Sequence, residues 1–144
     1  QLPQTWMVVT SDVGDSLDVH YRNKQPVGER LALQALHNVY EHTVVSEGPS
    51  CIKARAVDGQ VYLYFEHARS LQAKNGPLAG FEVAGEDGVY HVATAKIDGE
   101  SVVVHSAEVP HPTMVRYGWQ PFSRANLVNE AQLPCSTFEK KIQQ

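Results

Sequence analysis

The sequence predicts a short α/β unit followed by an antiparallel β-sandwich, and three observations lead to this fold class. A β-rich apolar run over residues 6–10 leads into a polar loop. A helical pattern follows over residues 26–40. After residue 48 the pattern changes to short alternating strands separated by turn signals. A length of 144 residues is typical of one domain and also fits a piece of a larger protein.

The first 45 residues contain one expected strand, one loop and one helix. Residues 6–10 have the composition of a buried strand, and the polar residues 11–15 place a loop at the carboxyl end of that strand. Pro26 suits the first turn of a helix, where the missing N–H would have no partner in any case. The apolar stripe of this predicted amphipathic helix consists of Val27, Leu31, Ala35, Leu36, Val39 and Tyr40.

The second part of the chain, residues 46–144, is expected to form the β-sandwich. Its six predicted strands cover residues 51–56, 61–65, 81–84, 89–97, 101–105 and 114–119. The turn signals between them are Asp58-Gly59, Gly76-Pro77, residues 85–88 and Asp98-Gly99. Because no helical pattern intervenes, antiparallel pairing is favoured. Residues 123–138 are expected to form an ordered loop that a few apolar anchors hold in place.

The composition argues against several classes of function. Hydrophobic residues make up 42% of the chain and charged residues 19%, which is typical of a globular protein. The formal net charge is −4 and the 12 Lys and Arg residues are scattered, so neither nucleic acid nor an anionic membrane is favoured as a partner. The longest apolar runs are far shorter than the roughly 20 residues that span a bilayer. We therefore expect no membrane-spanning segment.

The cysteines and histidines do not show the spacing of metal ligands. Cys51 and Cys135 lie far apart, which argues against a structural zinc site and leaves two alternatives, a pair of free thiols or one disulfide. Four histidines on or beside predicted helices and strands also lack a ligand pattern: His37, His42, His91 and His105. The sequence therefore predicts no metal site.

Two short motifs with hydrolytic chemistry lie in the loop after the first predicted strand. Residues 14–17, Gly-Asp-Ser-Leu, have the letters of the nucleophile motif of GDSL hydrolases. In those enzymes a helix begins directly behind the serine, whereas the helix predicted here begins only at Pro26. Ser16 is therefore interpreted as a turn residue, and a self-contained esterase that uses it is kept as an alternative. Asp18 and His20, in the same loop, have the residue types of a catalytic acid and base.

Residues 11–36 resemble the end of the catalytic domain in the sialate O-acetylesterase family of SGNH hydrolases. In that family a segment of the type Asp-Ile-His-Pro, two residues, Lys, then Val-Gly-x-Arg-Leu-Ala-Leu carries the catalytic histidine. The residues that match it are Asp18, Val19, His20, Lys24, Val27, Gly28, Arg30, Leu31, Ala32 and Leu33. Tyr21 replaces the family's proline after the histidine. Similar segments follow at residues 48–51, 78–88 and 115–138, so that the resemblance covers nearly the whole chain, but only the family's C-terminal part.

The resemblance implies a fold, a reaction and two site residues. Residues 1–45 would be the last strand, catalytic loop and helix of an SGNH α/β hydrolase domain, followed by the sandwich over residues 46–144. His20 would be the general base, with Asp18 as the acid that orients it and Asp15 as the second choice. The nucleophilic serine, the oxyanion donors and most of the parallel sheet would lie upstream of residue 1. The chain alone is therefore expected to be inactive.

The implied protein is a carbohydrate O-acetylesterase that hydrolyses acetyl esters on sugars through an acetyl-serine intermediate, without metal or cofactor. A periplasmic or secreted location also follows from the resemblance. The competing hypothesis is a non-catalytic β-sandwich that binds carbohydrate or supports a neighbouring domain. Aromatic residues that could line a sugar-binding face are Tyr62, Tyr64, Phe65, Tyr90, Tyr117 and Trp119.

Three further polar residues were considered for binding. Arg116 has the planar fork that would hold a sialate carboxylate, although a structural salt bridge is the other interpretation. Asn126 and Asn129 follow the last predicted strand, in a loop that could return towards the catalytic domain. The residues that contact substrate are not identified by the sequence.

Overall fold

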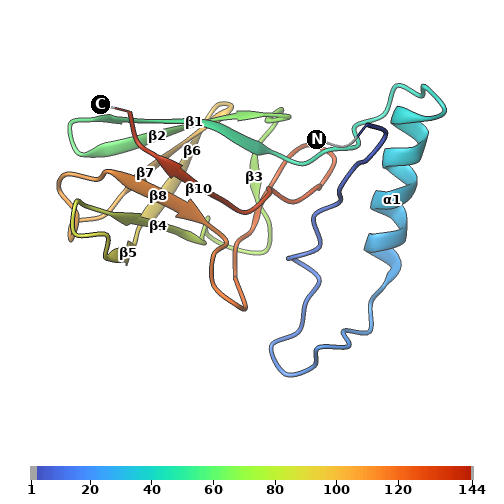
Figure 1. Cartoon of the computed structure of the whole chain (residues 1–144), viewed down its shortest axis with the longest axis horizontal. Helices are drawn as coiled ribbons and strands as arrows, with labels where there is room; N and C mark the ends of the chain where they lie inside the picture. Colours follow the sequence, from blue (N-terminus) through green and yellow to red (C-terminus); the bar gives the residue numbers. More distant parts are fainter. Residues whose placement is uncertain (1–2, 144) are drawn as a thin grey trace.

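The computed structural model describes residues 3–143, which form one helix and ten strands (Figure 1). The helix is α1 (Gln25–Asn38). The longer strands are β1 (Ser50–Val57), β2 (Gln60–Glu66), β4 (Phe81–Ala84), β6 (Thr94–Asp98), β7 (Ser101–His105), β8 (Met114–Tyr117) and β10 (Phe138–Lys141). The short ones are β3 (Gln72–Ala73), β5 (Tyr90–Val92) and β9 (Leu127–Val128). This part of the chain is therefore mostly β-structure.

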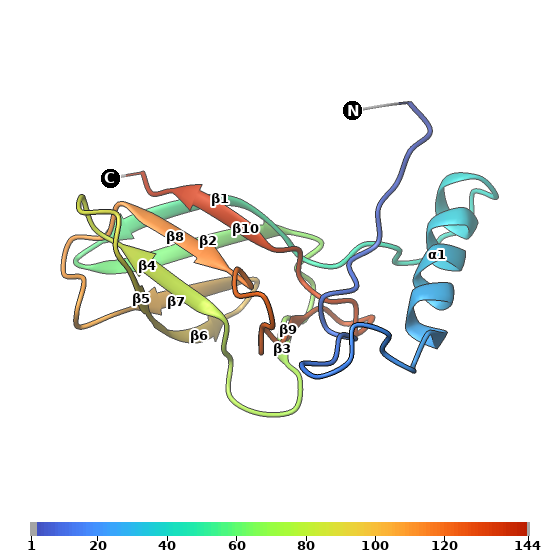
Figure 2. The same ribbon diagram turned by 60° about the horizontal axis from the view of Figure 1, so that its bottom comes forward.

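Two antiparallel four-stranded sheets face each other and form the expected sandwich. Their strand orders are β1-β2-β7-β6 and β10-β8-β4-β5, and β3 pairs with β9 in a small third sheet. Figures 1 and 2 show α1 and the extended segment before it beside one end of this sandwich rather than on the face of either sheet. The molecule thus has two parts that differ in structure, as the sequence predicts.

The hydrophobic core lies between the two large sheets. Val61 and Leu63 from β2 meet Phe81 and Val83 from β4, and all four side chains are almost completely buried. Tyr117 stacks against Phe81 and Phe138, with ring centroids 4.6 and 5.7 Å away. The cluster of buried apolar residues begins at Cys51 and ends at Ile142. Residues 3–50 therefore supply no member of this cluster.

The hairpin turns confirm the glycine signals in the sequence. Asp58 and Gly59 both have positive φ, 49° and 76°, between residues 57 and 60, which pair across β1 and β2. A two-residue turn of this kind matches the twist of the strands it joins, and it favours Asp-Gly because both positions need positive φ. Gly99 has φ 60° in the turn between β6 and β7, where Asp98 pairs with Ser101.

One predicted strand divides between the two sheets. Residues 89–97 were expected as a single strand, but β5 pairs with β4 in one sheet and β6 with β7 in the other. Between them Ala93 is buried, and its N–H donates to the Phe81 carbonyl over 3.0 Å. The chain thus crosses from one sheet to the other at Ala93, a corner at which a small side chain fits.

The last predicted strand and the tail also differ from the expectation in detail. β8 ends at Tyr117 because Gly118 turns the chain with φ 66°. The tail over residues 123–138 is held by buried anchors, as predicted, and these are Leu127, Val128, Leu133 and Phe138. It also contains β9, and β10 begins at its end, neither of which the sequence predicted.

The strand predicted over residues 6–10 is not formed in the structure. This segment runs extended, and within residues 3–143 no neighbouring strand pairs with it. A strand needs a partner for its N–H and C=O groups, so a β-rich segment without a neighbour stays unpaired. This is a correction to the strand-loop-helix expectation, of which the loop and the helix are present.

The helix forms almost where predicted but buries a different face. Pro26 lies in its first turn, and the last helical residue is Asn38 rather than residue 40. Its two fully buried side chains are Arg30 and Gln34, which are polar. Leu31 and Val39, from the predicted apolar stripe, are 53% and 59% exposed. The predicted apolar stripe is thus only half covered in this structure, because Val27, Ala35 and Leu36 are half-buried whereas Leu31, Val39 and Tyr40 are exposed.

Candidate active site

The loop over residues 11–24, with the two short sequence motifs, connects the extended segment to α1 and lies beside one end of the sandwich (Figures 1 and 2). Two aspartates shape it through short-range hydrogen bonds. Asp15 Oδ1 accepts from the backbone N–H of Leu17, and Asp18 Oδ1 accepts from the backbone N–H of His20, each over 2.8 Å. These are turns in which a carboxylate replaces a backbone carbonyl as acceptor.

His20 is exposed at the surface of this loop. Asp18 is close to it, but the hydrogen bond between them goes to the backbone of His20 and not to its imidazole ring. Within residues 3–143 the ring has no hydrogen-bond partner. Both ring nitrogens are thus accessible, one for a nucleophile and one for an orienting carboxylate.

Ser16 is exposed as well, and it lies in a bend rather than at the start of a helix. Helix α1 begins nine residues later, at Gln25. Among the described residues no hydrogen bond joins its hydroxyl to His20. Ser16 therefore lacks the neighbouring base and the helix N-terminus that activate a serine nucleophile.

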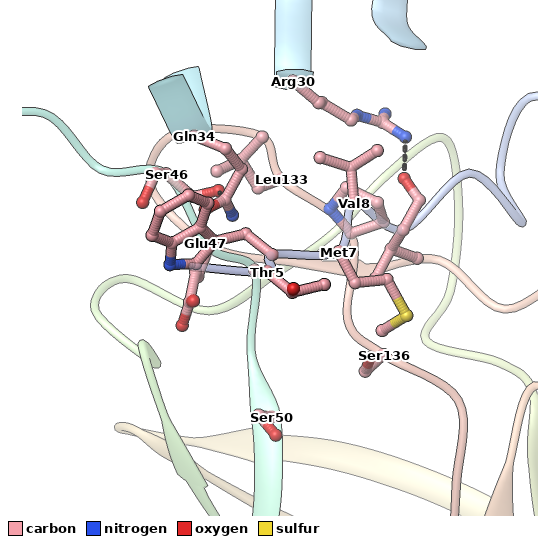
Figure 3. A pocket seen from close by; sticks show the side chains of 14 residues that line it. Thr5, Met7, Val8, Arg30, Gln34, Ser46, Glu47, Ser50, Leu133 and Ser136 are labelled. Atoms are coloured by element: carbon pink, nitrogen blue, oxygen red, sulfur yellow. Dashed lines mark hydrogen bonds between the residues drawn. The ribbon is translucent and has the colours of Figure 1, made fainter. Parts of the chain in front are cut away.

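The loop is attached to α1 by a partly buried ion pair that the sequence did not single out. The Arg30 guanidinium contacts both carboxylate oxygens of Asp12, at 2.6 and 2.7 Å. Its Nη1 also donates to the Val9 carbonyl over 2.6 Å, as Figure 3 shows. The side chains of Arg30 and Asp12 are only 9% and 17% exposed. The sequence pointed to Arg30, as the arginine of the segment that resembles the family motif, but not to Asp12 as its partner.

A second contact involves the residue that departs from the family pattern. The Lys24 ammonium lies over the Tyr21 ring, 3.6 Å from its centroid. A cation above an aromatic face is attracted by the ring quadrupole, at exposed sites by about 0.5–1 kcal/mol. Tyr21 thus contributes a contact across the end of the loop at the position where the family has a proline.

A cavity of about 450 Å³ lies between the extended segment, α1 and the base of the sandwich (Figure 3). Trp6 and Met7 line it on one side, and Ser46 and Glu47 from the segment after the helix line it on another. Gln34 borders it as well and donates through Nε2 to the Ser46 carbonyl over 2.9 Å. None of Asp15, Asp18 and His20 lines this cavity, so it is separate from the loop over residues 11–24.

Arg116 forms a structural ion pair. Its Nε donates to Glu82 Oε2 over 2.8 Å, and its guanidinium lies 3.7 Å from the centroid of the Tyr90 ring. The side chains of Arg116 and Glu82 are 18% and 12% exposed. The Tyr90 hydroxyl donates to Glu139 Oε2 over 2.8 Å. The guanidinium is thus already engaged by residues of its own sheet, and this arrangement agrees with the salt-bridge interpretation.

The aromatic residues do not gather on one surface. Tyr117 is buried, and its hydroxyl accepts from the Leu127 N–H over 2.8 Å. Tyr64 is largely exposed on β2, between the inward-facing Leu63 and the half-buried Phe65. Phe65 packs edge-on against Phe138, with centroids 6.1 Å apart. Tyr117 and Phe65 are therefore not available to a shared sugar-stacking platform.

Asn126 and Asn129 hold the tail against the sandwich. Asn126 donates to the carbonyls of Lys74 and Pro77 and accepts from the Ala79 N–H, over 2.9 to 3.0 Å. Asn129 Nδ2 donates to the carbonyls of Glu47 and His67, over 2.9 and 3.2 Å. Its Oδ1 accepts from the N–H groups of Ala131 and Leu133, both over 3.2 Å. Both amides are therefore structural, and Asn129 ties the tail to the segment that follows α1.

The two cysteines are free and buried. Burial raises the pKa of the Cys51 thiol to about 11, and it also raises the pKa of Cys135. The thiolate form, which is the reactive and metal-binding one, is thus disfavoured at both positions.

In the part of the chain described here, no three His, Cys, Asp or Glu residues gather as a metal site. The helix at residues 25–38 is not of a length and hydropathy that would span a membrane.

Comparisons with known proteins found similarity to a solved structure. No protein-family model matches the chain, and neither does any curated protein. A crystal structure of a novel carbohydrate acetylesterase from Xanthomonas citri is similar over 90% of the chain, with a TM-score of 0.85 and 41% sequence identity. The present chain spans 31% of the length of that protein. It is thus closely similar to one part of a carbohydrate acetylesterase.

Proposed function

We propose that this chain is the C-terminal part of a carbohydrate O-acetylesterase of the sialate O-acetylesterase type, in the SGNH hydrolase superfamily. The observation that carries this proposal is the similarity to the Xanthomonas citri acetylesterase, which covers 90% of this chain but only 31% of that protein. The Asp-x-His loop that resembles the family's catalytic loop lies in the same chain. Together they support an esterase whose remaining catalytic groups lie upstream of residue 1.

In the proposed reaction His20 is the general base. It takes the proton of an upstream serine hydroxyl as the oxygen attacks the acetyl carbonyl, and it returns that proton to the departing sugar hydroxyl. It then activates a water molecule that releases acetate from the acetyl-serine. Its exposed ring, without a partner among residues 3–143, is available for such a contact.

Asp18 is the proposed orienting acid, and Asp15 is the second choice. Each carboxylate uses one oxygen, Oδ1, in a turn of the loop. The other oxygen of each has no hydrogen-bond partner among the described residues and is free to accept from the imidazole. The negative charge of the orienting carboxylate stabilises the imidazolium that forms during the reaction, and a neutral asparagine would not. The variants Asp18→Asn and Asp15→Asn therefore test which of the two aspartates orients His20.

The proposed partner of residues 1–45 is the upstream SGNH catalytic region of the same protein. The segment over residues 6–10 is extended and pairs with no strand among the described residues, and apart from the Val9 and Thr10 carbonyls, which already accept hydrogen bonds, its backbone is open to a neighbouring strand. Met7 is 74% exposed and Leu17 is 96% exposed. Part of the apolar stripe of α1 is also open. An upstream sheet would cover these groups and supply the serine and the oxyanion donors, with residues 46–144 as a separate sandwich domain.

The test compares the 144-residue chain with the longer protein that includes its upstream region, using p-nitrophenyl acetate and an acetylated oligosaccharide. We expect activity only in the longer protein, lost in its His20→Ala variant and retained in its Ser16→Ala variant. Activity of the short chain that disappears with Ser16→Ala would instead establish the self-contained esterase. A fully active His20→Ala variant would favour the non-catalytic sandwich module. The periplasmic or secreted location that we also propose is tested by fractionating cells that express the longer protein.

A further inference from the structure

We propose that the ion pair between Asp12 and Arg30 is a positioning element that holds the His20 loop in its working place on helix α1. This inference rests on the proposed function, because it assigns the pair a role in the same site. Neither residue is a candidate acid or base of the reaction. Their role would be to fix where His20 stands relative to groups supplied by the upstream region.

The geometry of the pair suits a rigid attachment. Both carboxylate oxygens of Asp12 face the two terminal nitrogens of Arg30, at 2.6 and 2.7 Å. A paired fork of this kind fixes orientation as well as distance, which a single contact to a lysine ammonium does not. The additional bond from Nη1 to the Val9 carbonyl, 2.6 Å long, attaches the chain before the loop to the same guanidinium. Low exposure of both side chains shields the pair from water.

The ion pair closes the loop, because one of its residues lies near the beginning of the loop and the other in the helix that follows the loop. Asp12 stands near the loop's beginning and Arg30 in the second turn of the helix that follows, so His20 lies within the closed stretch. The loop's other polar contacts join residues close in sequence, Asp15 to Leu17, Asp18 to His20 and Lys24 to Tyr21. These contacts shape local turns but do not attach the loop to the rest of the molecule.

The space at the base of the loop is not filled by side chains. A cavity of about 440 Å³ lies at the base of the loop, bordered by Asp12, Gly14 and Asn23 on the loop side. Arg30 borders it from α1, and residues 131–133 border it from the tail. Within residues 3–143, Asp12–Arg30 is thus the long-range polar contact on which the position of the loop depends. A misplacement of about 1 Å can cost a catalytic group roughly 100-fold in rate.

The test uses Asp12→Asn and Arg30→Lys, with Glu29→Gln as a matched control. Asp12→Asn keeps the size of the side chain but removes its charge, and Arg30→Lys keeps the charge but removes the fork. Glu29 is a neighbouring exposed residue whose contact, with Gln25 Nε2 at 2.6 Å, lies within the helix. A double variant, Asp12→Asn with Arg30→Lys, measures whether the two residues act as one unit.

Two measurements separate positioning from simple loss of fold. In the 144-residue chain, amide hydrogen exchange over residues 11–24 should become at least several-fold faster in Asp12→Asn, while exchange in β2 and β7 stays as in the unaltered chain. In the longer protein, we expect kcat to fall by about 10- to 100-fold with little change in KM. The titre of acylated enzyme, counted from the p-nitrophenol burst, should show that the active sites are still present. Glu29→Gln should change neither the exchange of residues 11–24 nor kcat.

Unchanged exchange of the loop in both single variants would overturn the proposal, whatever the activity. Faster exchange with unchanged kcat would also overturn it, because the loop would then be held by the pair without any consequence for catalysis. A fall in activity that matches a lower titre of active sites would show a purely structural role. If the longer protein has no activity that depends on His20, the proposed function fails, and the exchange result alone then decides whether the pair fixes the loop.

Discussion

Gly48 lies where the segment after α1 passes the tail of the chain, and its lack of a side chain is needed there. An added Cβ would overlap the backbone carbonyl of Pro134 and lie 3.1 Å from the carbonyl oxygen of Leu133. Backbone atoms on both sides cannot move away as the end of a flexible side chain could. The nearby bond from the Ser136 N–H to the Pro49 carbonyl, 3.0 Å long, holds the two segments together.

We therefore expect Gly48→Ala to lower the free energy of unfolding by about 3 kcal/mol, as overpacking does. Gly28→Ala is the control, because a Cβ at Gly28 would meet nothing within 4 Å. It should stabilise α1 by roughly 0.5–1 kcal/mol, since alanine favours helix more than glycine does. Urea denaturation followed by circular dichroism measures both. An unchanged midpoint for Gly48→Ala would mean that the two segments are not in contact.

The buried thiol of Cys51 predicts a dependence of stability on pH. Its pKa is raised by burial from 9.0 to about 11 in the folded chain. Well below pH 9 the thiol is protonated in both states, so it makes no difference to stability. As the pH rises from 9 to 11 the unfolded chain loses this proton first, and the free energy of unfolding should therefore fall.

Urea denaturation at pH 8 and pH 10.5 measures this fall. The matched control is the double variant Cys51→Ala with Cys135→Ala, because burial raises the pKa of both thiols. In the control, the free energy of unfolding should depend less on pH than in the unaltered chain. The part of the pH dependence that comes from other titratable groups should remain. Rapid labelling of both thiols by a disulfide reagent in the native chain at pH 8 would contradict the burial on which this prediction depends.

At the scale of single elements, α1 is unusual because it buries polar side chains and exposes apolar ones. Arg30 and Gln34 face the rest of the chain, where Gln34 also accepts from Asn38 Nδ2 over 2.8 Å. Leu31 and Val39 face solvent. A helix with a predicted apolar stripe on its open side is typical of one that contacts a further partner. This is the element whose environment differs most from the sequence-based expectation.

Leu31→Gln tests whether the upstream region covers this face. In the 144-residue chain the change should alter the free energy of unfolding by less than about 0.5 kcal/mol, as at other exposed positions. In the longer protein it should cost roughly 2–3 kcal/mol, because a buried leucine would be replaced by a polar residue. His37→Gln, at another exposed position of α1, serves as the control in both. Equal effects of Leu31→Gln in the two proteins would mean that the face stays open.

At the scale of the whole molecule, the sandwich has a complete core of its own. The buried apolar cluster contains only residues from Cys51 to Ile142. The polar contacts that join the first 45 residues to the rest are few, such as the one from Gln34 to the Ser46 carbonyl. This distribution of buried contacts is the basis for the expectation that the chain divides near residue 45.

We expect a chain of residues 46–144 to fold by itself. Its thermal unfolding should be cooperative, with a midpoint within a few degrees of that of the 144-residue chain, and its amide spectrum should keep the dispersed peaks of the sandwich. A peptide of residues 1–45 should be largely unfolded, since a short helix without a packed face is marginal in water. A shortened chain that unfolds without cooperativity would show that the first part is needed for the sandwich.

The strands and turns of the sandwich could be predicted from the sequence because their signals are local. Alternation in β2 follows from the side chains of adjacent residues, and Asp58-Gly59 satisfies its turn through its own φ angles. The candidate loop was recognised by resemblance, since an acid and a histidine at short spacing are not specific by themselves. Asp12 and Arg30 were not recognised as a pair, because residues 18 positions apart meet only when the chain is folded.

By itself, the sequence determined the β-rich second part, the helix that begins near Pro26, and the loop with Asp18 and His20, because each depends on neighbouring residues. The tertiary structure decided which sheet each strand joins, so that residues 89–97 divide at Ala93. It also decided that α1 buries Arg30 and Gln34 and that residues 6–10 stay unpaired. The physical reason is that the periodicity of a segment shows that it has an apolar face, whereas the segments that cover this face are distant in the sequence.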